Sequence, residues 1–389
     1  MGAARPLGGG AAPRHELRTL LHRHGRTMPP RHGLPAFADA LHGAPDLPAF
    51  PRTAPEGLTM SEAGPTMSGK AVIGKDGWLF LSNDTNRTWD QFEGRLLLDD
   101  TEITAWTQEL ALRGAFMRKH NIHYRFIVAP NKECILPDKV PAEMQKAPAR
   151  LVHQVETATM GLVHGMFLER FILGHAARLS FYDKGDTHWN ALGAWHVANH
   201  VFKSLQLPQE ITLITEEELA LHPSETMIGD LSNKFDPPIS CGGMQATLRD
   251  SRARCSFDNR ITNHGHVSIW EGGDPEGPSI LLFGDSFAGA LVKYLAHRTR
   301  RLVRVHSSSI DREILFRERP EVVLSIAVER FLRSVPTGIA EFSYKTDLRQ
   351  KIQALDGEAR QKLFAGMRER QSPANAAYAA DVLSAMPFE

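Results

Sequence analysis

Two short polar segments contain the residue types that nucleophilic catalysis requires. Gly284-Asp285-Ser286 follows an apolar run, and Asp186-Thr187-His188 lies earlier in the chain. A serine hydroxyl is a weak nucleophile at neutral pH, so it needs a base to take its proton and hydrogen-bond donors to hold the oxyanion that forms. We predict Ser286 as the nucleophile, with His188 as its base and Asp186 as the carboxylate that orients the imidazole.

The surroundings of Ser286 favour this chemistry. The serine lies between a strand-like run, Ser279–Phe283, and an amphipathic segment, Phe287–His297. In an open α/β sheet, ligands bind at the carboxyl ends of the strands, where a helix presents backbone N–H groups and the positive end of its dipole. Gly284 permits a tight turn and the approach of a substrate, so the N–H groups of Gly284 and Ser286 are candidate oxyanion donors.

Each of these segments also has a purely structural explanation. Gly-Asp-Ser is common at the start of a helix, where Asp or Ser caps free backbone amides. The chain has 18 histidines, and His188 alone could be a capping or surface residue. The Asp-x-His spacing is the additional feature, because it lets both side chains project toward the same side of an extended turn.

Alternating strand-like and helix-like segments surround the two motifs. We expect a β-hairpin of residues 71–81 around a Gly-Lys-Asp-Gly turn, and apolar periodicity indicates further elements. The expected helices cover residues 101–120, 148–172, 192–205 and 287–297, and the expected strands 124–129, 179–182, 279–283, 302–306 and 322–328. This alternation predicts a mostly parallel sheet with helices on both faces.

Composition divides the chain into three parts and limits its partners. Residues 1–68 are rich in Pro and Gly and indicate a flexible or loosely docked arm, residues 69–335 a catalytic domain, and residues 336–389 a helical extension. The 45 acidic and 45 basic residues lack the excess of positive charge of a nucleic-acid binder. Three cysteines without Cys-x-x-Cys spacing suggest no metal site, and we expect no cofactor.

Localisation follows from the apolar segments. No stretch approaches the roughly 20 apolar residues that span a bilayer, and the start of the chain lacks the apolar run of a secretory signal. We therefore expect a cytoplasmic protein as the sequence is written, and a periplasmic one if a leader is missing.

Together the motifs resemble the SGNH hydrolase-like superfamily, in its alginate O-acetyltransferase branch (the AlgJ and AlgX type). The resemblance spans residues 68–335. It is carried by Gly-Lys-Asp-Gly-Trp-Leu-Phe (74–80), Ala-Pro-Asn-Lys-Glu (129–133), Asp-Thr-His-Trp-Asn (186–190), Gly-Asp-Leu (229–231) and Phe-Gly-Asp-Ser-Phe (283–287). It implies a three-layer α/β/α fold with a circularly permuted motif order, in which Asp-x-His precedes Gly-Asp-Ser.

The resemblance also assigns roles to individual residues. Ser286, His188 and Asp186 match the family's nucleophile, base and orienting carboxylate. Asn131 and Lys132 match a segment that lines the substrate pocket, although an ordinary turn explains them equally well. Arg330 follows the strand at 322–328 and falls at the sheet edge, where it could contact a ligand or form an ordinary salt bridge.

Three functions fit these features. The first is an O-acetyltransferase, in which an acyl group loaded onto Ser286 passes to a hydroxyl of a carbohydrate. The second is a carbohydrate acetylesterase with the same triad, because water exclusion decides which nucleophile deacylates the enzyme. The third is a glycan-binding module without catalysis. The expected partners are a carbohydrate acceptor and an acyl donor, with a membrane acyltransferase as a candidate supplier; the sequence leaves the oligomeric state open.

Overall fold

The structure, a computed structural model, describes residues 66–67, 69–369 and 372–385. Apart from Thr66–Met67, the arm that the sequence predicts at residues 1–68 lies outside the described residues.

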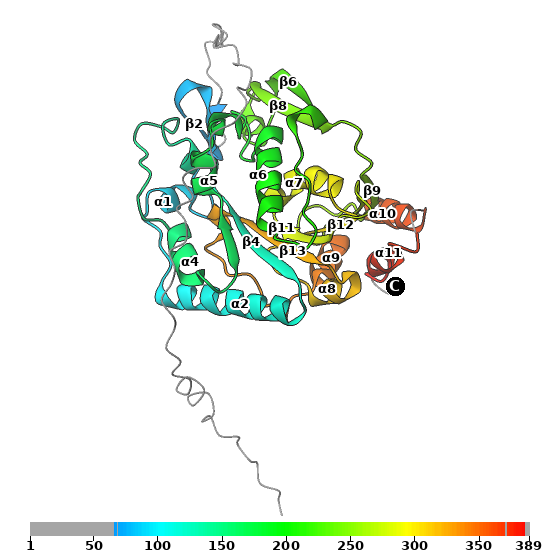
Figure 1. Ribbon diagram of the computed structural model, residues 1–389. Coiled ribbons are helices and arrows are strands. Elements are labelled where there is room, and N and C mark those ends of the chain that lie inside the picture. The colour runs from blue at the N-terminus through cyan, green and yellow to red at the C-terminus, as the bar shows by residue number, and fades with distance from the viewer. Residues whose placement is uncertain (1–65, 68, 370–371, 386–389) are drawn as a thin grey trace, which may run out of the picture. The chain divides into compact units, whose positions relative to one another are not determined.

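A seven-stranded sheet forms the centre of the described fold (Figure 1). Its strand order is β5-β4-β13-β11-β12-β10-β9. The first five strands run parallel to one another, whereas β10 is antiparallel to both β12 and β9. The strands are β4 (His123–Ala129), β5 (His164–Phe167), β9 (Arg254–Asp258), β10 (Val267–Glu271), β11 (Ser279–Gly284), β12 (Arg301–His306) and β13 (Val322–Val328).

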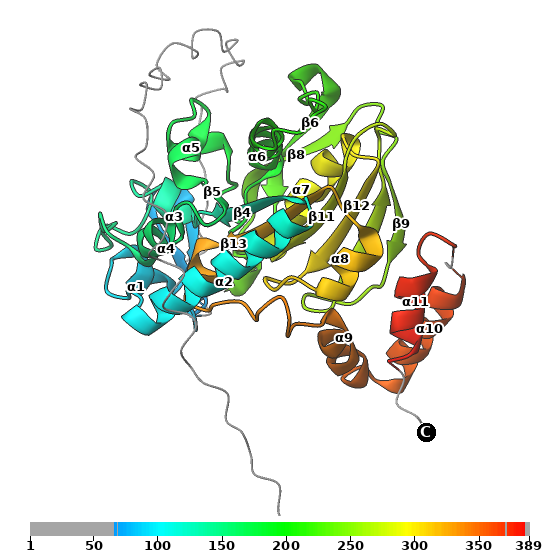
Figure 2. The ribbon, with the colours of Figure 1, turned by 60° about the horizontal axis from the view of Figure 1, so that its bottom comes forward.

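Helices cover both faces of this sheet, as the two views show (Figure 2). One face packs against α1 (Thr88–Phe92), α3 (Lys132–Ile135), α5 (Glu169–Leu173), α6 (Ala191–Ser204) and α7 (Ser286–His297). The other packs against α2 (Asp100–Lys119), α4 (Leu151–Thr159) and α8 (Arg312–Glu318). The result is the three-layer α/β/α fold that the sequence predicts.

The central strands explain why two cores form. In β11, Ile280 and Leu282 face the α6–α7 side, while Leu281 and Phe283 face the α2 side. Every residue of β13 is buried. A strand covered on both faces is apolar at nearly every position, and its side chains alternate between the two cores.

Three small two-stranded sheets accompany the main sheet. β2 (Ala71–Ile73) pairs with β3 (Leu79–Leu81), which confirms the expected hairpin. β1 (Thr66–Met67) pairs with β7 (Phe235–Asp236). The third, of β6 (Leu219–Met227) and β8 (Cys241–Leu248), stands beside α6 and α7 and has no counterpart among the expected elements (Figure 1).

Three helices end the described chain: α9 (Tyr344–Gln353), α10 (Gly357–Glu369) and α11 (Ala376–Leu383). Their apolar side chains join the core on the α2 face. Asp381 of α11 accepts hydrogen bonds from Arg317 and Tyr344, so ion pairs as well as apolar contacts attach these helices to α8. Within the described residues, no helix combines the length and the apolar character needed to cross a membrane.

Two expected elements are wrong. The single helix expected at 148–172 is interrupted by β5, because Gly161 adopts a positive φ of 79° and turns the chain after α4. The strand expected at 179–182 is a short 3-10 helix, Arg178–Ser180, followed by one isolated bridge between Tyr182 and Trp189. Phe181 and Tyr182 are buried although they lie in a loop, with Phe181 packed against α5 and α6, whereas Leu179 is exposed. Buried apolar residues in a short run therefore do not by themselves indicate a strand.

Candidate active site

Ser286 occupies the turn at which β11 becomes α7. It is the first residue of the helix, and its side chain is exposed. Asp285 is the N-cap residue: its Oδ1 accepts from the N–H of Phe287 at 2.9 Å, and its Oδ2 accepts from the N–H of Val328 at 2.7 Å. The cap therefore also fastens the serine turn to the end of β13, which holds Ser286 at the carboxyl edge of the sheet.

Gly284 serves packing and not the approach of a substrate, which corrects the role that the sequence suggests. A Cβ atom at this position would lie 2.8 Å from Cβ of Ala288 and 2.9 Å from the carbonyl oxygen of Ile326. Gly284 is also paired in register with strands on both sides. The missing side chain lets α7 start close to β13, and the residue belongs to the sheet interior.

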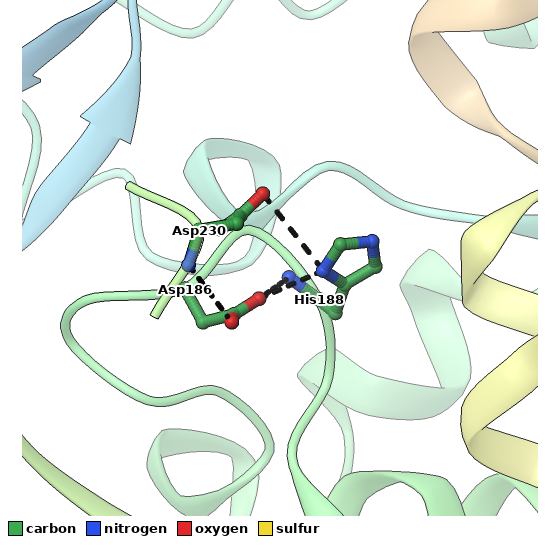
Figure 3. Close-up of side chains that lie close together, drawn as sticks. All are labelled: Asp186, His188 and Asp230. Carbon is green, nitrogen blue, oxygen red and sulfur yellow. Dashed lines mark hydrogen bonds and ion pairs between the residues drawn. The ribbon is translucent and has the colours of Figure 1, made fainter. Parts of the chain in front are cut away.

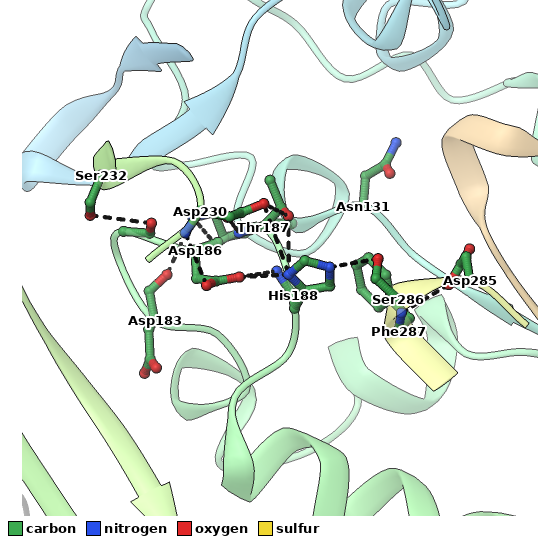
Figure 4. A network of polar contacts seen from close by, with 12 residues as sticks. Asn131, Asp183, Asp186, Thr187, His188, Asp230, Ser232, Asp285, Ser286 and Phe287 are labelled. Carbon is green, nitrogen blue, oxygen red and sulfur yellow. Dashed lines mark hydrogen bonds and ion pairs between the residues drawn. The ribbon is translucent and has the colours of Figure 1, made fainter. Parts of the chain in front are cut away.

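A continuous hydrogen-bonded chain joins Ser286, His188 and Asp186 (Figure 4). Nε2 of His188 lies 2.7 Å from Oγ of Ser286, and Nδ1 lies 2.8 Å from Oδ1 of Asp186. Because a carboxylate only accepts hydrogen bonds, Nδ1 carries a proton and Nε2 is left to accept from the serine hydroxyl. The expected proximity of the three side chains is confirmed.

The imidazole is also fixed by its neighbours. Its ring centroid lies 4.9 Å from that of Phe287, the residue after Ser286. The backbone N–H of His188 donates to Asp186 Oδ1 at 2.8 Å, so one carboxylate oxygen holds both the ring and the main chain of the histidine.

Hydrogen bonding keeps Asp186 ionised. Burial alone would raise the pKa of this carboxyl group, but the hydrogen bond and charge of His188, with backbone N–H donors from His188 and Asp230, hold the pKa well below its usual range. An ionised carboxylate beside Nδ1 stabilises the imidazolium that forms when His188 takes a proton.

Asp230 is a second carboxylate beside the histidine, and the sequence reasoning assigned it no role (Figure 3). Its backbone N–H donates to Asp186 Oδ2 at 3.2 Å, and its Oδ2 lies 3.9 Å from His188 Nδ1. Its carboxylate accepts from both the N–H and the hydroxyl of Thr187. The Gly-Asp-Leu segment at 229–231 is the signal that could have identified it.

Two glycines let the Asp230 loop reach the triad. A Cβ atom at Gly229 would lie 2.3 Å from the carbonyl oxygen of Gly185, and one at Gly185 would lie 2.1 Å from Oγ of Ser232. The two loops therefore touch through their backbones, which brings the N–H of Asp230 to Asp186.

Lys132 does not line the pocket, which corrects the substrate contact expected for it. Its side chain is buried, with 2% of its surface exposed. Nζ donates to the carbonyl oxygens of Asp183, Lys184 and Asp186 at 3.2, 3.1 and 2.7 Å. Its ammonium group also lies over the rings of Trp78 and Phe80. Lys132 thus holds the loop that carries Asp186.

Asn131 and Arg330 lie together near the serine. Nη1 of Arg330 donates to Oδ1 of Asn131 at 3.3 Å, and the guanidinium lies 5.7 Å from the ring centroid of Phe287. Figure 4 places the Asn131 side chain on the same side of the site as Ser286. The neighbouring Glu329 forms an ion pair with Arg150 at 3.0 Å.

Asp186, His188 and Asp230 offer three ligand-type atoms within 4.8 Å of one another, the geometry that a metal ion would need. The hydrogen bonds among these residues already account for their proximity, since Nδ1 of His188 is engaged by Asp186.

An open cleft of about 500 Å³ begins at His188 and Asp186. It continues between α6, α7 and the β6–β8 hairpin, so His188 and Asp186 line an open groove and not an enclosed pocket.

Comparison with known proteins places this site in a family. Residues 71–309, more than half of the chain, match the model of a protein family described as the SGNH hydrolase-like domain of the acetyltransferase AlgX. The chain belongs to this AlgX family. Its members are SGNH-type O-acyltransferases, so the chain is an enzyme of that type.

Three solved structures are similar to this AlgX-family chain at low sequence identity, and the two with TM-scores above 0.5 share its fold. PatB1 of Bacillus cereus has 16% identity and a TM-score of 0.55, with 70% of this chain and 100% of PatB1 covered. A DHHW family protein of Eubacterium siraeum has 11% identity and a TM-score of 0.52, with 70% and 95% covered. The O-acetyltransferase domain of Pseudomonas putida AlgJ has 17% identity and a TM-score of 0.47, with 75% and 98% covered. No curated protein matches the sequence.

Proposed function

We propose that the chain transfers an acetyl group to a hydroxyl of a carbohydrate through an acyl-enzyme on Ser286. The observation that carries this proposal is the hydrogen-bonded chain from Ser286 Oγ through His188 to Asp186, at 2.7 and 2.8 Å. Membership in the AlgX family supports the acetyl group and the carbohydrate acceptor.

Acylation follows from this geometry. His188 Nε2 takes the proton of the Ser286 hydroxyl as Oγ attacks the carbonyl carbon of the donor ester. When the tetrahedral intermediate collapses, the bond to the leaving oxygen breaks and His188 gives that oxygen its proton. The acetyl group then remains on Ser286.

Deacylation repeats the same steps with the acceptor. His188 takes a proton from a sugar hydroxyl, whose oxygen attacks the acetyl carbonyl carbon. Ser286 Oγ leaves and regains the proton, and the acetylated sugar departs. Asp186 remains ionised throughout and stabilises the imidazolium.

We assign two donors to the oxyanion that forms in both steps. One is the N–H of Ser286 at the N-terminus of α7, where the helix dipole also favours negative charge. The second is the side-chain amide of Asn131: its oxygen accepts from Arg330, so its NH₂ group remains to donate. The N–H of Gly284 does not fit the role of oxyanion donor, because Gly284 is paired within the sheet.

The exposure of Ser286 favours a second activity, hydrolysis of the acyl-enzyme. Water can reach an open site, and water exclusion decides between transfer and hydrolysis. We therefore expect slow acetate release in the absence of a sugar and transfer when an acceptor occupies the site.

Incubation with p-nitrophenyl acetate tests the function directly. Free acetate and acetylated sugar are both followed, with and without candidate sugars, for the wild type and for Ser286→Ala. The proposal expects ester turnover that depends on Ser286 and a shift from acetate to acetylated sugar when acceptor is added. Acetate release that no sugar ever diverts would indicate an esterase, and sugar binding without any ester turnover would indicate a glycan-binding module.

A further inference from the structure

The cleft that begins at the triad follows one face of α7. Ser286, Gly289, Ala290 and Lys293 are spaced as i, i+3, i+4 and i+7, so they lie on the same side of the helix. The last three line the cleft. Two turns of helix extend about 10 Å, which is the separation of Ser286 and Lys293 along α7.

The geometry points to an acceptor subsite in this cleft, which binds further rings of an uncharged glycan whose reacting ring lies at Ser286. The carboxylates of Asp183 and Asp186 line the cleft, and its lining lysine, Lys293, is bonded to the carbonyl of Ala246, so the lining does not favour an anionic glycan. This inference rests on the proposed acyl transfer, because it assigns the cleft to the acceptor of that reaction.

The walls of the cleft are fixed at both ends. On one side, Lys293 donates to the carbonyl of Ala246 and ties α7 to β8 of the hairpin. On the other, the N–H of Met244 donates to Oδ1 of Asp183 at 3.1 Å and ties the hairpin to the loop that carries the triad. A groove held by such bonds is formed before a ligand arrives, which lowers the ordering cost of binding.

The lining combines aromatic and polar groups, as a sugar ring requires. Trp270 is half-buried and lines the cleft, as do Met227 and Met244. Gln245 is exposed on the hairpin, and no described residue forms a hydrogen bond with Oδ2 of Asp183. The C–H face of a pyranose can lie against an indole ring while its hydroxyls bond to a carboxylate and an amide.

An alkyl chain fits the same groove less well. The cleft is open to solvent, and Asp183, Gln245 and Lys293 line it. A long acyl chain would remove these polar groups from water without offering them a hydrogen bond, which is unfavourable. The small residues Gly289 and Ala290 leave room along the helix for a flat ring.

The test is isothermal titration calorimetry of the full chain with uncharged β-1,4-linked probes: glucose and N-acetylglucosamine, and the di-, tri- and tetrasaccharides of each. We expect the affinity for at least one series to rise with the number of rings. Ala290→Trp, which fills the groove, should weaken binding of the trisaccharide by at least about tenfold. Ala105→Trp, at a partly exposed alanine of α2, is the matched control and should bind like the wild type.

Gln245→Ala gives a second test that does not depend on the folding of Ala290→Trp, because Gln245 is exposed on the hairpin. It should weaken trisaccharide binding several-fold. A wild type that binds neither series, or affinities that neither variant changes, would overturn the subsite. Turnover of p-nitrophenyl acetate is measured in parallel. Its absence in the wild type would argue against acyl transfer at Ser286, whereas the subsite is tested by the calorimetric affinities and not by turnover.

Discussion

Nζ of Lys132 lies 2.7 Å from the backbone carbonyl oxygen of Asp186, the carboxylate residue of the proposed triad. The same ammonium group bonds to the carbonyls of Asp183 and Lys184, and the side chain is almost fully buried. A single buried cation thus fixes the loop from which Asp186 reaches His188. The position of the triad carboxylate therefore depends on Lys132, which touches none of the reacting atoms.

Deprotonation of Lys132 should lower the activity at alkaline pH. Burial lowers its pKa to about 8, although the charges of Asp186, Asp230 and Glu133 raise it. Above this pH the neutral amine loses one of its three N–H donors, so we predict that kcat/KM for p-nitrophenyl acetate falls. Lys132→Met should have lower activity at every pH and lack this decrease, and it should lose about 1–3 kcal/mol of unfolding free energy, because buried carbonyls lose their donor.

Stability separates this positioning effect from general unfolding. Between pH 8 and 10.5 the unfolded chain, in which the lysine has its ordinary pKa, holds more protons than the folded chain. The contribution of Lys132 to stability therefore rises with pH in this window. Activity that falls while the melting temperature also falls would contradict the assignment. Lys203→Met, at an exposed lysine of α6, is the control and should change stability by less than about 0.5 kcal/mol.

Gly229→Ala should disturb the triad by displacing the loop that carries Asp186. Its new methyl group would lie 2.3 Å from the carbonyl oxygen of Gly185 and 2.9 Å from Cβ of Asp186, and backbone atoms cannot move aside cheaply. We expect a loss of about 1–3 kcal/mol in unfolding free energy and a clear loss of ester turnover.

Gly366→Ala is the matched control for that change. Gly366 lies within α10, and a Cβ atom there would meet no atom within 4 Å. Alanine in a helix interior should raise stability by about 0.5–1 kcal/mol. Denaturant unfolding of both variants measures the difference, and equal effects at the two glycines would show that the contact with Gly185 is unimportant.

The two carboxylates beside His188 should differ in importance. Asp186→Asn should slow acylation by about two to four orders of magnitude, because the amide neither fixes the Nδ1–H tautomer nor stabilises the imidazolium. Asp230→Asn should cost about 10- to 100-fold, since Asp230 supports the loop mainly through Thr187 and its own N–H. Pre-steady-state release of p-nitrophenol measures both rates, and a larger effect at Asp230 would reverse the assigned roles.

Removal of the Asn131 amide tests the oxyanion site. Asn131→Ala should lower kcat for p-nitrophenyl acetate by about 10²- to 10³-fold, as expected for the loss of one oxyanion donor. Arg330→Lys should cost less, because Arg330 acts on the oxyanion through Asn131. A normal kcat in Asn131→Ala would leave the N–H of Ser286 as the main donor.

Local sequence patterns predict most of the sheet and the position of the serine. The apolar run of β11 and the cap residue Asp285 are local signals, and the helix after Ser286 begins where the periodicity indicates. Asp186 and His188 are two residues apart, so their mutual contact could also be expected. The approach of His188 to Ser286 depends on tertiary packing. Local patterns do not predict this contact, and its expectation came from the family resemblance.

The supporting residues escape sequence reasoning for a physical reason. Lys132 is a charged residue at the start of the short helix α3, and its burial depends on carbonyl groups some 50 positions away. Asp230 reaches Asp186 because two glycine loops touch, which no spacing indicates. The β6–β8 hairpin that walls the cleft consists mostly of exposed and half-buried residues, so it gives a weak apolar signal.

The most direct test of the account is the location of the acyl group after exposure to p-nitrophenyl acetate without a sugar acceptor, by mass spectrometry of peptides from acid-quenched protein. The account predicts an acetyl adduct on Ser286 that accumulates when deacylation is slow, disappears on addition of an acceptor and is absent from Ser286→Ala. An adduct on another residue, or full ester turnover by Ser286→Ala, would contradict it and leave Gly-Asp-Ser as the N-terminal cap of α7.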